Sequence, residues 1–579
     1  MDRVLPRLWA VPGLALALAL SGLGWMWLGR PIALPDVPDG RFQCLSYTPH
    51  SEAGSPLTAG AEGYSIPPGL IAQDLALLKA YTGCVRTYSV LGQQGDVLAA
   101  AAAEGMQVLL GVWIGADEDR NRREIGRALE LSRAHPEAVR AIVVGNEVLL
   151  RREMTGARLA ALLRSVKART GLPVAYADIS HFWLQSPEVA EAADLILLHI
   201  LPYWDDPHAG PVAEAEASVR AIVARARAAW PTKRIEIGEI GWPSAGRTRS
   251  RAAPGRVNEA RLVRGIAAGA AALGMRYNLI EAIDQPWKRV PEGTVGGFWG
   301  VLDAGRRLKF PLQGPVSEWP RWRDAAAFTA AVSLAAFLWG LLGRARVSPG
   351  RWLGLGLAAP CCGAAGVALA DQVAALAIGP LGWAWGALLL GLAAAGGMVL
   401  LWAVLGGPGA SPASADPLPV ERPRGSAVRA LSLRAALGLL HGVVMLTAAV
   451  AALLLAADGR HRDFLTLAYA LPAAGFALVF WQQRRAAPAP AAPPAGAQPL
   501  SAQLSPAQPS PAPPGRHSEA GWLATTVGVC GALAIDHPGN LEAWAWAACC
   551  ALLALPWLRY AGREAVHLGR ALGRAARGP

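Results

Sequence analysis

The fold is decided by the stretch Arg234-Ile235-Glu236-Ile237-Gly238-Glu239-Ile240-Gly241-Trp242-Pro243-Ser244, in which an apolar alternation runs into a carboxylate followed by Gly, Trp and Pro. The alternation has the period of two expected of a strand, and Gly241 and Pro243 prevent its simple continuation. We therefore expect Glu239 to end a strand at the mouth of a sheet or barrel. A single glutamate in this position is usually only solvated, so a second carboxylate of the same kind is needed before it indicates chemistry.

Composition indicates a membrane protein. The chain has 579 residues, 53% of them hydrophobic and 17% charged, and a mean hydropathy of +0.29, which is too apolar for a soluble enzyme and too long for one domain. The net charge of +12 does not indicate nucleic acid, because the Arg residues gather beside hydrophobic runs rather than in patches interleaved with aromatic residues. Few Lys beside abundant Ala, Gly and Pro suggest a GC-rich bacterial genome.

The first apolar run, residues 8–28, is about as long as the ~20 residues that span a bilayer. A cleaved signal peptide is the alternative, but its apolar core is typically ~7–15 residues and is followed by small residues. Bulky residues occupy that place here, at Trp25, Met26 and Trp27. We expect an uncleaved transmembrane anchor within residues 1–36.

Seven further apolar runs follow residue 320, near 325–343, 352–370, 380–406, 431–457, 464–481, 521–535 and 541–558. The loops rich in Arg alternate with loops that have little basic excess, so the positive-inside rule places both termini in the cytoplasm and residues 37–318 outside it. Segments 407–427 and 486–516 are rich in Pro and Ala and are expected to be linkers within a membrane domain at 319–579.

Residues 37–318 alternate strands with amphipathic helices, which is typical of parallel β/α units. Eight strands are predicted, at 42–47, 84–88, 107–113, 141–147, 173–178, 194–201, 234–239 and 277–284. Helices are predicted at 71–80, 121–134, 156–168, 212–229 and 258–273. The fold class is therefore an α/β (β/α)8 TIM barrel, whose usual length is ~250 residues, joined to a multi-span helical membrane domain.

The second carboxylate is Glu147, which ends the apolar run 141–147 in Gly-Asn-Glu. It ends the fourth predicted strand and Glu239 ends the seventh, so the two converge across the mouth of an eight-stranded barrel. Such a pair is what glycoside cleavage requires: one carboxyl, with a raised pKa, protonates the leaving oxygen, and the other attacks or activates water. Glu236 has the wrong parity to share a face with Glu239, so we expect it to point toward the helices.

Cys44 and Cys84 lie in the barrel region, and the other five cysteines lie in or beside apolar runs. None has zinc-ligand spacing. A disulfide between Cys44 and Cys84 requires that their strands be neighbours and that the compartment be oxidising, and two buried free thiols are the alternative.

The motifs Val144-Gly145-Asn146-Glu147 and Gly238-Glu239-Ile240-Gly241-Trp242-Pro243-Ser244 resemble those of glycoside hydrolase family 17, the β-1,3-glucanase-type retaining barrels, with Ile240 where Thr is commonest. Residues 84–88, 199–204, 277–288, 292–300 and 309–312 are similar to a bacterial branch described as membrane-bound β-(1,6)-glucan synthases, related to the cyclic β-glucan proteins. The resemblance covers residues 42–316. Over the membrane half it is only architectural.

This resemblance implies that Glu147 is the general acid/base and Glu239 the nucleophile, with Asn146 bound to a sugar 2-hydroxyl. A glucan groove also needs aromatic platforms and hydrogen-bonding groups. The candidates are Arg86, Tyr88, Trp113, His199, Tyr203, Trp204, Trp242, Glu281, Gln285, Trp287, Lys288 and Trp299. For the tryptophans the alternative is ordinary packing of loops. We expect His199 to be a hydrogen-bonding residue rather than a metal ligand, because no partner lies at metal-ligand spacing.

The sequence thus predicts a retaining glycosidase or transglycosylase that remodels, branches or cyclises a periplasmic β-1,3/1,6-glucan at a bacterial inner membrane. No metal or other cofactor is expected, and nucleic acid is excluded as a partner. The alternative from another class is a non-catalytic glucan-binding or export module. A partner glucan synthase or exporter is one interpretation of the many membrane spans.

Overall fold

The computed structural model describes residues 8–49, 66–205, 209–343, 347–406, 433–486 and 516–575. The chain divides into two compact units. The barrel unit is Arg30–Pro320, and the helical unit is Met1–Gly29 together with Arg321–Pro579. The linkers predicted at 407–427 and 486–516 lie almost wholly outside the described residues.

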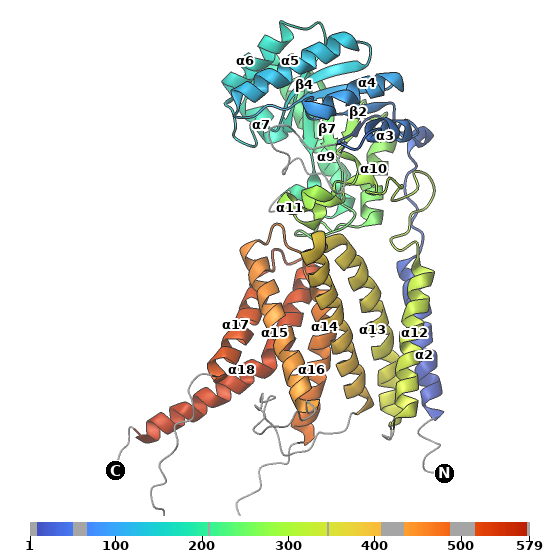
Figure 1. Ribbon diagram of the computed structural model, residues 1–579, viewed down its shortest axis with the longest axis vertical. Helices are drawn as coiled ribbons and strands as arrows, with labels where there is room; N and C mark the ends of the chain where they lie inside the picture. The colour runs from blue at the N-terminus through green and yellow to red at the C-terminus, as the bar shows by residue number, and fades with distance from the viewer. Residues whose placement is uncertain are drawn as a thin grey trace, which may run out of the picture. The chain divides into compact units, whose positions relative to one another are not determined.

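The barrel unit contains a closed barrel of eight parallel strands that follow one another in chain order (Figure 1). The predicted fold class and the eight strands are confirmed. The strands are β1 (Leu45–Ser46), β2 (Cys84–Arg86), β3 (Gln107–Val112), β4 (Val139–Asn146), β5 (Val174–Ile179), β6 (Leu195–Ile200), β7 (Arg234–Ile240) and β8 (Tyr277–Leu279). The eighth predicted strand is shorter than expected, because β9 (Glu281–Ile283) leaves the barrel and pairs with β10 (Gly300–Leu302).

Helices surround the strands, and the five predicted amphipathic helices are present. Two of them begin at the side-chain caps that their sequences supply, Asp117 and Thr155, each of which accepts a backbone N–H of the first turn. The helices are α3 (Leu70–Leu78), α4 (Asp96–Ala103), α5 (Glu118–Ala134), α6 (Gly156–Lys167), α7 (Ser180–Gln185), α8 (Pro187–Ala192), α9 (Val212–Ala229), α10 (Arg256–Gly269) and α11 (Arg289–Glu292). Short 3₁₀ turns are η1 (Pro38–Gly40), η2 (Gly92–Gly95), η3 (Pro202–Trp204), η4 (Pro286–Lys288) and η5 (Thr294–Gly297).

The strands that carry the two glutamates each contain an irregularity just before the glutamate. On β7, Leu198 is paired with Ile237 but the next residue, His199, is paired with Glu239, so Gly238 is an extra residue. On β4, Val143 is paired with Ala175 of β5 and Asn146 with Ala177. Strand β4 thus advances by three residues while β5 advances by two. Bulges of this kind turn the following side chain to a new direction, and they often lie next to active sites.

The bulge at Gly238 corrects one prediction. Glu236 does not point toward the helices: it is paired with Leu197, which belongs to the apolar cluster inside the barrel, and it forms a buried ion pair with Arg140. Arg140 also contacts Sγ of Cys84 in the same cluster. Strict alternation places residues 236 and 239 on opposite faces, whereas one extra residue brings both to the interior.

A disulfide joins Cys44, the residue before β1, to Cys84, the first residue of the neighbouring strand β2. The bond belongs to the apolar cluster inside the barrel, which also contains Leu109, Ala141, Val143, Ala175, Ala177, Leu195 and Leu197. Of the two alternatives that the sequence left open, the structure has the disulfide.

The two ends of the barrel unit meet at a short antiparallel bridge. The backbone N–H of Ile32 donates to the carbonyl of Val316 over 2.8 Å, and the N–H of Val316 donates to the carbonyl of Ile32 over 2.9 Å. The chain therefore enters and leaves this unit at one place.

Every predicted apolar run forms a helix of the helical unit. The helices are α2 (Ala10–Leu28), α12 (Trp322–Leu342), α13 (Pro349–Leu376), α14 (Gly379–Leu405), α15 (Leu433–Ala457), α16 (Thr466–Ala486), α17 (Arg516–Leu533) and α18 (Leu541–Ala575). Among the described residues, six helices are long and apolar enough to cross a membrane, whereas the apolar parts of α16 and α17 are shorter than a full span. The runs 464–481 and 521–535, which the sequence analysis counted with the other apolar runs, are the two that fall short of this length.

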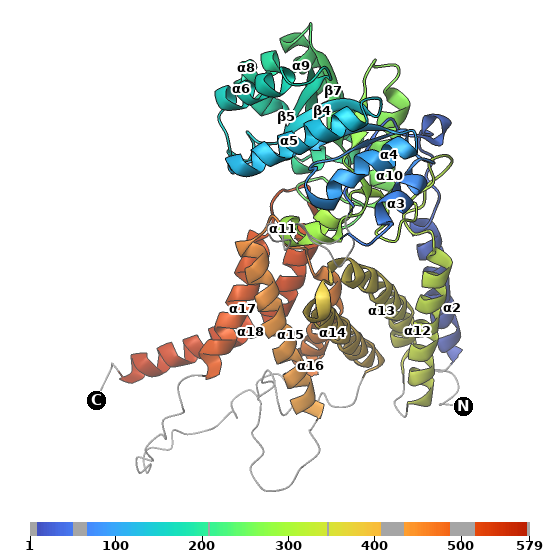
Figure 2. The same cartoon turned by 45° about the horizontal axis from the view of Figure 1, so that its top comes forward.

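Helix α2 packs beside α12 and α13, the two helices that follow the barrel in the sequence (Figures 1 and 2). Nε1 of Trp25 donates to the hydroxyl of Thr329 over 2.8 Å. At Gly13 a Cβ atom would come within 2.5 Å of the carbonyl oxygen of Trp352, so only glycine permits this close crossing of α2 and α13. The first helix is therefore an integral part of the helical unit rather than a separate anchor.

Candidate active site

Glu147 and Glu239 approach each other at the carboxyl ends of β4 and β7. An oxygen of each carboxylate and a ring nitrogen of His199 all lie within 4.8 Å of one another. The Glu147 side chain is 23% exposed and that of Glu239 is 7% exposed. Glu147 is thus the carboxylate that an incoming ligand reaches more readily.

The backbone at Glu147 is held in the left-handed region. Its φ is 55°, and Gly145 before it has φ 95°. The N–H of Glu147 donates to the carbonyl of Ala177 over 2.8 Å, which fixes this conformation against β5. Conformations that are costly for a side-chain-bearing residue persist where surrounding contacts impose them, often at functional sites.

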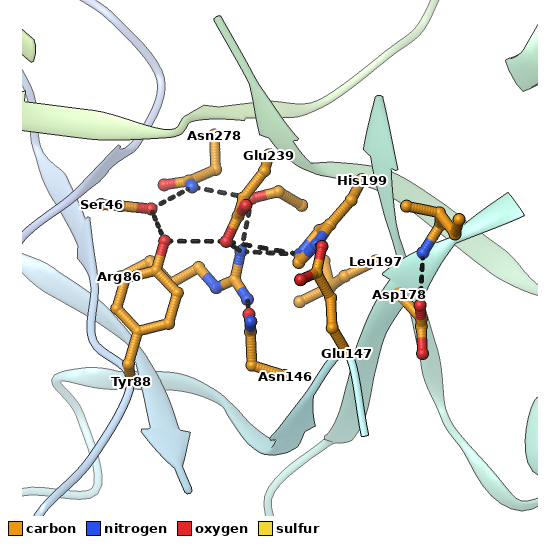
Figure 3. Close-up of polar contacts among 12 residues, drawn as sticks. Ser46, Arg86, Tyr88, Asn146, Glu147, Asp178, Leu197, His199, Glu239 and Asn278 are labelled. Carbon is orange, nitrogen blue, oxygen red and sulfur yellow. Dashed lines mark hydrogen bonds and ion pairs between the residues drawn. The ribbon is translucent and has the colours of Figure 1, made fainter. Parts of the chain in front are cut away.

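Arg86, buried at the end of β2, joins the groups of the site (Figure 3). Its Nη1 donates to Oε1 of Glu239 over 3.0 Å and to the carbonyl of Gly238 over 2.7 Å, and it lies 3.1 Å from Nε2 of His199. Its Nη2 donates to Oδ1 of Asn146 over 2.6 Å. The bond to Arg86 orients the Asn146 amide, whose Nδ2 is the group able to donate to a ligand.

A second chain of hydrogen bonds reaches Glu239 from the other side. The hydroxyl of Tyr88 donates to Oε1 of Glu239 over 2.8 Å, and its oxygen lies 2.9 Å from Oγ of Ser46. Nδ2 of Asn278 donates to Ser46 and to the carbonyl of Gly238, both over 2.8 Å. Burial, followed by the negative charge of Glu239, raises the pKa of Tyr88, so the phenol keeps its proton as a donor.

Sequence analysis missed Ser46 and Asn278. Both are polar residues on short predicted strands that are otherwise mostly apolar, and both are buried. A small polar side chain at such a position is a signal in itself, since a buried polar group requires a partner.

His199, at the end of β6, lies between the two glutamates. Its Nδ1 is 2.7 Å from Oε1 of Glu147, and its Nε2 is 3.5 Å from Oε1 of Glu239. The three side chains are close enough together to hold a metal ion. However, Nη1 of Arg86 already occupies the position next to Glu239 and Nε2 of His199, and a cation in the same place would be repelled by the guanidinium.

The pKa of Glu147 corrects another expectation. Burial would raise the pKa of Glu147, but the hydrogen bond from His199 and the positive charges of Arg86 and Arg151 together lower it below its ordinary value. The expected acid of the pair, by contrast, has a raised pKa. The surroundings of Glu147 therefore favour its carboxylate form.

Four further predicted residues lie on and after β9. Lys288 forms a buried ion pair with Glu281 and interacts electrostatically with Tyr88, which places this pair near the tyrosine that donates to Glu239. Burial raises the pKa of Glu281 to about 8. Nε1 of Trp287 donates to Oε1 of the buried Gln285 over 2.9 Å, so these two residues are linked to each other.

The aromatic residues after β6 and β7 pack mainly against one another. Trp242 is 0% exposed and its Nε1 donates to the carbonyl of Ala253, so the expectation that it lines a sugar groove is wrong. Tyr203 is equally buried between Trp242 and Trp299. Packing is therefore the role of these side chains, the alternative that the sequence left open. Trp204 is only partly buried and stacks on Trp299.

Trp113 follows β3 and is partly buried. The guanidinium of Arg151 lies over its ring, 4.3 Å from the centroid. Arg151 also donates to the carbonyls of Asn146 and Ile114 and to the carboxylate of Glu153. This cluster supports the loop that contains Glu147.

A family model matches residues 44–300, the stretch that contains all eight strands. Its description is the BtgE/BtgC glycoside hydrolase domain. The barrel is a glycoside hydrolase domain of this family.

Curated relatives cover the same part of the chain. The glycoside hydrolase domain is 28% identical over 264 residues to a glucan 1,3-beta-glucosidase of Candida albicans, a match that covers 41% of this chain and 84% of that protein. It is 24% identical over 263 residues to a glucan 1,3-beta-glucosidase of Saccharomyces cerevisiae, covering 41% of this chain and 83% of that protein. A solved glycoside hydrolase family 17 beta-1,3-glucanosyltransferase from Rhizomucor miehei is 26% identical, with 47% of this chain and 98% of that chain covered and a TM-score of 0.41.

Proposed function

We propose that the chain cleaves a β-1,3-glucan with retention of configuration and passes the released glucosyl chain to another sugar or to water. Glu239 is the nucleophile in this proposal, and Glu147 is the general acid and base. The observation that carries it is the separation of the two carboxylates, whose nearest ligating oxygens lie within 4.8 Å. Retaining enzymes hold the two carboxyl groups ~5–5.5 Å apart, whereas inverting enzymes leave ~6.5–9.5 Å for a water.

The surroundings of the two glutamates support this division of roles. Glu239 is the more buried of the two and is fixed by Arg86 and Tyr88, an arrangement that holds a nucleophile in one direction. Glu147 is more exposed, and such a position suits a group that must meet first the leaving oxygen and then an acceptor. In this proposal Nδ2 of Asn146, whose Oδ1 accepts from Arg86, donates to a hydroxyl beside the reacting carbon.

The substrate class rests on the relatives. The proteins that match the barrel are glucan 1,3-beta-glucosidases, so we propose a β-1,3-linked glucan as the donor. The covalent intermediate on Glu239 permits transfer as well as hydrolysis, and the products distinguish them.

We further propose that the barrel acts outside the cytoplasm of a bacterial cell, with the helical unit in the inner membrane. The six helices long enough to cross a membrane and the Cys44–Cys84 disulfide support this location, because disulfides persist in oxidising compartments. The topology is tested with two cysteine variants, Arg122→Cys on the barrel and Gly459→Cys between α15 and α16. Each variant is labelled with a membrane-impermeant maleimide. The arrangement predicted from the basic loops requires both positions to react in intact spheroplasts, and protection of Arg122→Cys contradicts it.

The enzymatic proposal is tested by incubating the detergent-purified chain with laminari-oligosaccharides and following the products by mass spectrometry. Longer products indicate transfer and shorter ones hydrolysis. Glu239→Ala must abolish both. With added azide, Glu239→Ala must yield the α-glucosyl azide and Glu147→Ala the β-glucosyl azide, because azide replaces the nucleophile in the first variant and attacks the intermediate in the second. Unchanged sugars with the wild-type protein favour a non-catalytic glucan-binding module.

A further inference from the structure

The hydrogen bonds that lead from Asn278 to Glu239 run in one direction (Figure 3). Nδ2 of Asn278 lies 2.8 Å from the carbonyl oxygen of Gly238, which can only accept, so the amide must present its nitrogen on this side. The same nitrogen donates its second hydrogen to Oγ of Ser46 over 2.8 Å. The backbone of the bulge at Gly238 therefore fixes the orientation of the Asn278 amide.

The direction of the remaining bonds follows from the number of hydrogens. The hydroxyl of Tyr88 has one hydrogen and two neighbours, Oε1 of Glu239 at 2.8 Å and Oγ of Ser46 at 2.9 Å. A carboxylate is the stronger acceptor, so Tyr88 donates to Glu239. Ser46 already accepts from Asn278, so it turns its own hydrogen to the oxygen of Tyr88. Each member of the chain thus donates toward Glu239.

A chain of this kind strengthens its last hydrogen bond. A hydroxyl whose oxygen accepts a hydrogen bond becomes a better donor, because successive bonds polarise one another. Ser46 and Asn278 are both buried, and hydrogen bonds in the interior of a protein are electrostatically stronger than in water. Tyr88 is therefore a stronger donor to Glu239 than a phenol without these neighbours.

Both donors to the Glu239 carboxylate contact the same oxygen. Oε1 accepts from the hydroxyl of Tyr88 over 2.8 Å and from Nη1 of Arg86 over 3.0 Å. Among the described residues, no group donates a hydrogen bond to Oε2. In the proposed reaction Oε2 is thus the oxygen that attacks, and Oε1 becomes the carbonyl oxygen of the glucosyl ester.

Negative charge leaves Glu239 in the first half of that reaction and returns in the second. First, Oε2 bonds to the anomeric carbon, the bond from that carbon to the leaving oxygen breaks, and the leaving oxygen takes the proton of Glu147. Then the acceptor oxygen bonds to the anomeric carbon and gives its proton to Glu147, while the bond to Oε2 breaks and its electron pair returns to Glu239. Donors at Oε1 stabilise the returning charge, so they assist the second step and not the first.

We infer that Asn278 and Ser46 are positioning residues that act through Tyr88 to assist the departure of Glu239 from the covalent intermediate, the step that passes the glucosyl chain to its acceptor. This inference rests on the proposed function and deepens it. It is distinct from support of the fold, because a residue that only supports the fold affects both steps alike.

The two steps are measured separately with 2-deoxy-2-fluoro-β-laminaribiosyl fluoride and the detergent-purified chain. The fluorine at C2 slows both steps and fluoride leaves readily, so the intermediate accumulates. Loss of activity with time gives the rate of formation, and recovery with laminaritriose after removal of the reagent gives the rate of departure. Ser46→Ala should not slow formation and should slow recovery about 3–10-fold, the effect of losing one ordinary hydrogen bond.

Two further variants test the path of this effect. Ser46→Thr keeps the hydroxyl and should restore the wild-type rate of recovery. In the Tyr88→Phe background, Ser46→Ala should slow recovery no further, because the contact through which it acts is gone.

The part of Asn278 is tested with Asn278→Asp, whose carboxylate accepts from Ser46 and turns that hydrogen away from Tyr88. Recovery should again be slowed, and Ser46→Ala should add nothing in this background. Additive losses would contradict an action of Asn278 through Ser46.

The inference is overturned if Ser46→Ala slows formation as much as recovery, if it leaves recovery unchanged, or if it slows recovery equally in the Tyr88→Phe background. These results need no variant of Asn278, so the test stands even where Asn278→Asp does not fold. Failure of the proposed function gives a different result. The wild-type chain would then form no covalent adduct with the reagent, as seen by mass spectrometry of the intact protein, and would not differ from Glu239→Ala.

Discussion

Cys84 and Arg86 lie two residues apart on β2 and face the same interior of the barrel, so the disulfide lies one layer below the guanidinium that binds Glu239. Cys44, directly before β1, and Ser46, on β1, are also two residues apart, and Ser46 is bonded to Tyr88. One covalent bond thus fixes the two strands from which Arg86 and Ser46 approach the site.

Loss of this bond should reduce stability and activity together. We expect Cys44→Ser/Cys84→Ser to lower the free energy of unfolding by about 2–4 kcal/mol, a typical value for a disulfide. The temperature of half-inactivation and kcat/KM at 25 °C measure the two effects. Cys361→Ser, at an exposed free cysteine of the helical unit, is the control and should change neither. Equal values for the two variants would contradict a role for the disulfide.

Arg86→Lys should lower kcat/KM by at least about 10²-fold, the usual effect of removing a single donor that stabilises charge at a reacting centre. One ammonium does not reproduce the planar guanidinium, whose two terminal nitrogens reach Glu239, Gly238 and Asn146 at once. Steady-state kinetics on laminari-oligosaccharides is the measurement. Arg122→Lys on the surface of α5 is the matched control, since Arg122 is 68% exposed. A loss of less than threefold for Arg86→Lys would show that the lysine restores the contacts.

Gly238→Ala should reduce activity more than stability. A Cβ atom there would lie 2.8 Å from Cβ of Leu197 and 3.1 Å from Cδ2 of His199, so β7 must shift at the residue that directs Glu239. Gly126→Ala on α5 is the control, because a Cβ atom there meets nothing within 4 Å, and it should stabilise the helix by up to about 1 kcal/mol. Activity and thermal inactivation are compared for both variants. Full activity of Gly238→Ala would mean that the bulge does not set the direction of Glu239.

The buried carboxyls around Lys309 should make stability fall as the pH rises. Burial raises the pKa of Glu259 to about 8 and that of Asp284 to about 6, although both contact Nζ of Lys309 at 3.0 Å and 2.9 Å. Both pKa values are raised above those of the unfolded chain, so the folded state binds more protons. The stabilisation from Glu259 is complete below about pH 4.5 and is lost as the pH rises toward about 8.

With Glu259→Gln, stability should therefore fall less between about pH 4.5 and about pH 8 than it does in the wild type. Thermal inactivation of the wild-type and variant chains at half-unit intervals of pH measures it. Glu104→Gln, a surface partner of Lys79, is the control and should leave the decline unchanged. A wild-type stability that rises over this interval would contradict the raised pKa of Glu259.

The sequence predicted the strands and both glutamates because the ends of these strands can be recognised: an apolar run meets Gly-Asn-Glu, and an apolar alternation meets Gly-Glu-Ile-Gly. It did not predict that Glu236 shares the interior with Glu239. In a regular strand each side chain is assigned to a face by its position along the strand. The extra residue at Gly238 shifts the faces of the residues after it, although the apolar pattern of the sequence does not show it.

The sequence left open whether the tryptophans are buried or line a sugar groove. Trp242 follows a strand end, as a sugar platform does, but whether its ring meets a ligand or Tyr203 depends on loops whose paths the sequence does not specify. The lowered pKa of Glu147 depends on the position of a single imidazole from another strand.

The packing of α2 has a consequence for biosynthesis. The partners that cover α2, Thr329 and Trp352, are translated only after the whole of Arg30–Pro320. At the usual rate of synthesis, roughly 15–60 s pass between the translation of α2 and that of these partners. The helical unit is thus interrupted by a complete inserted domain, whose two ends are joined at Ile32 and Val316. The barrel is therefore synthesised, folded or still folding, before α2 can pack against α12 and α13.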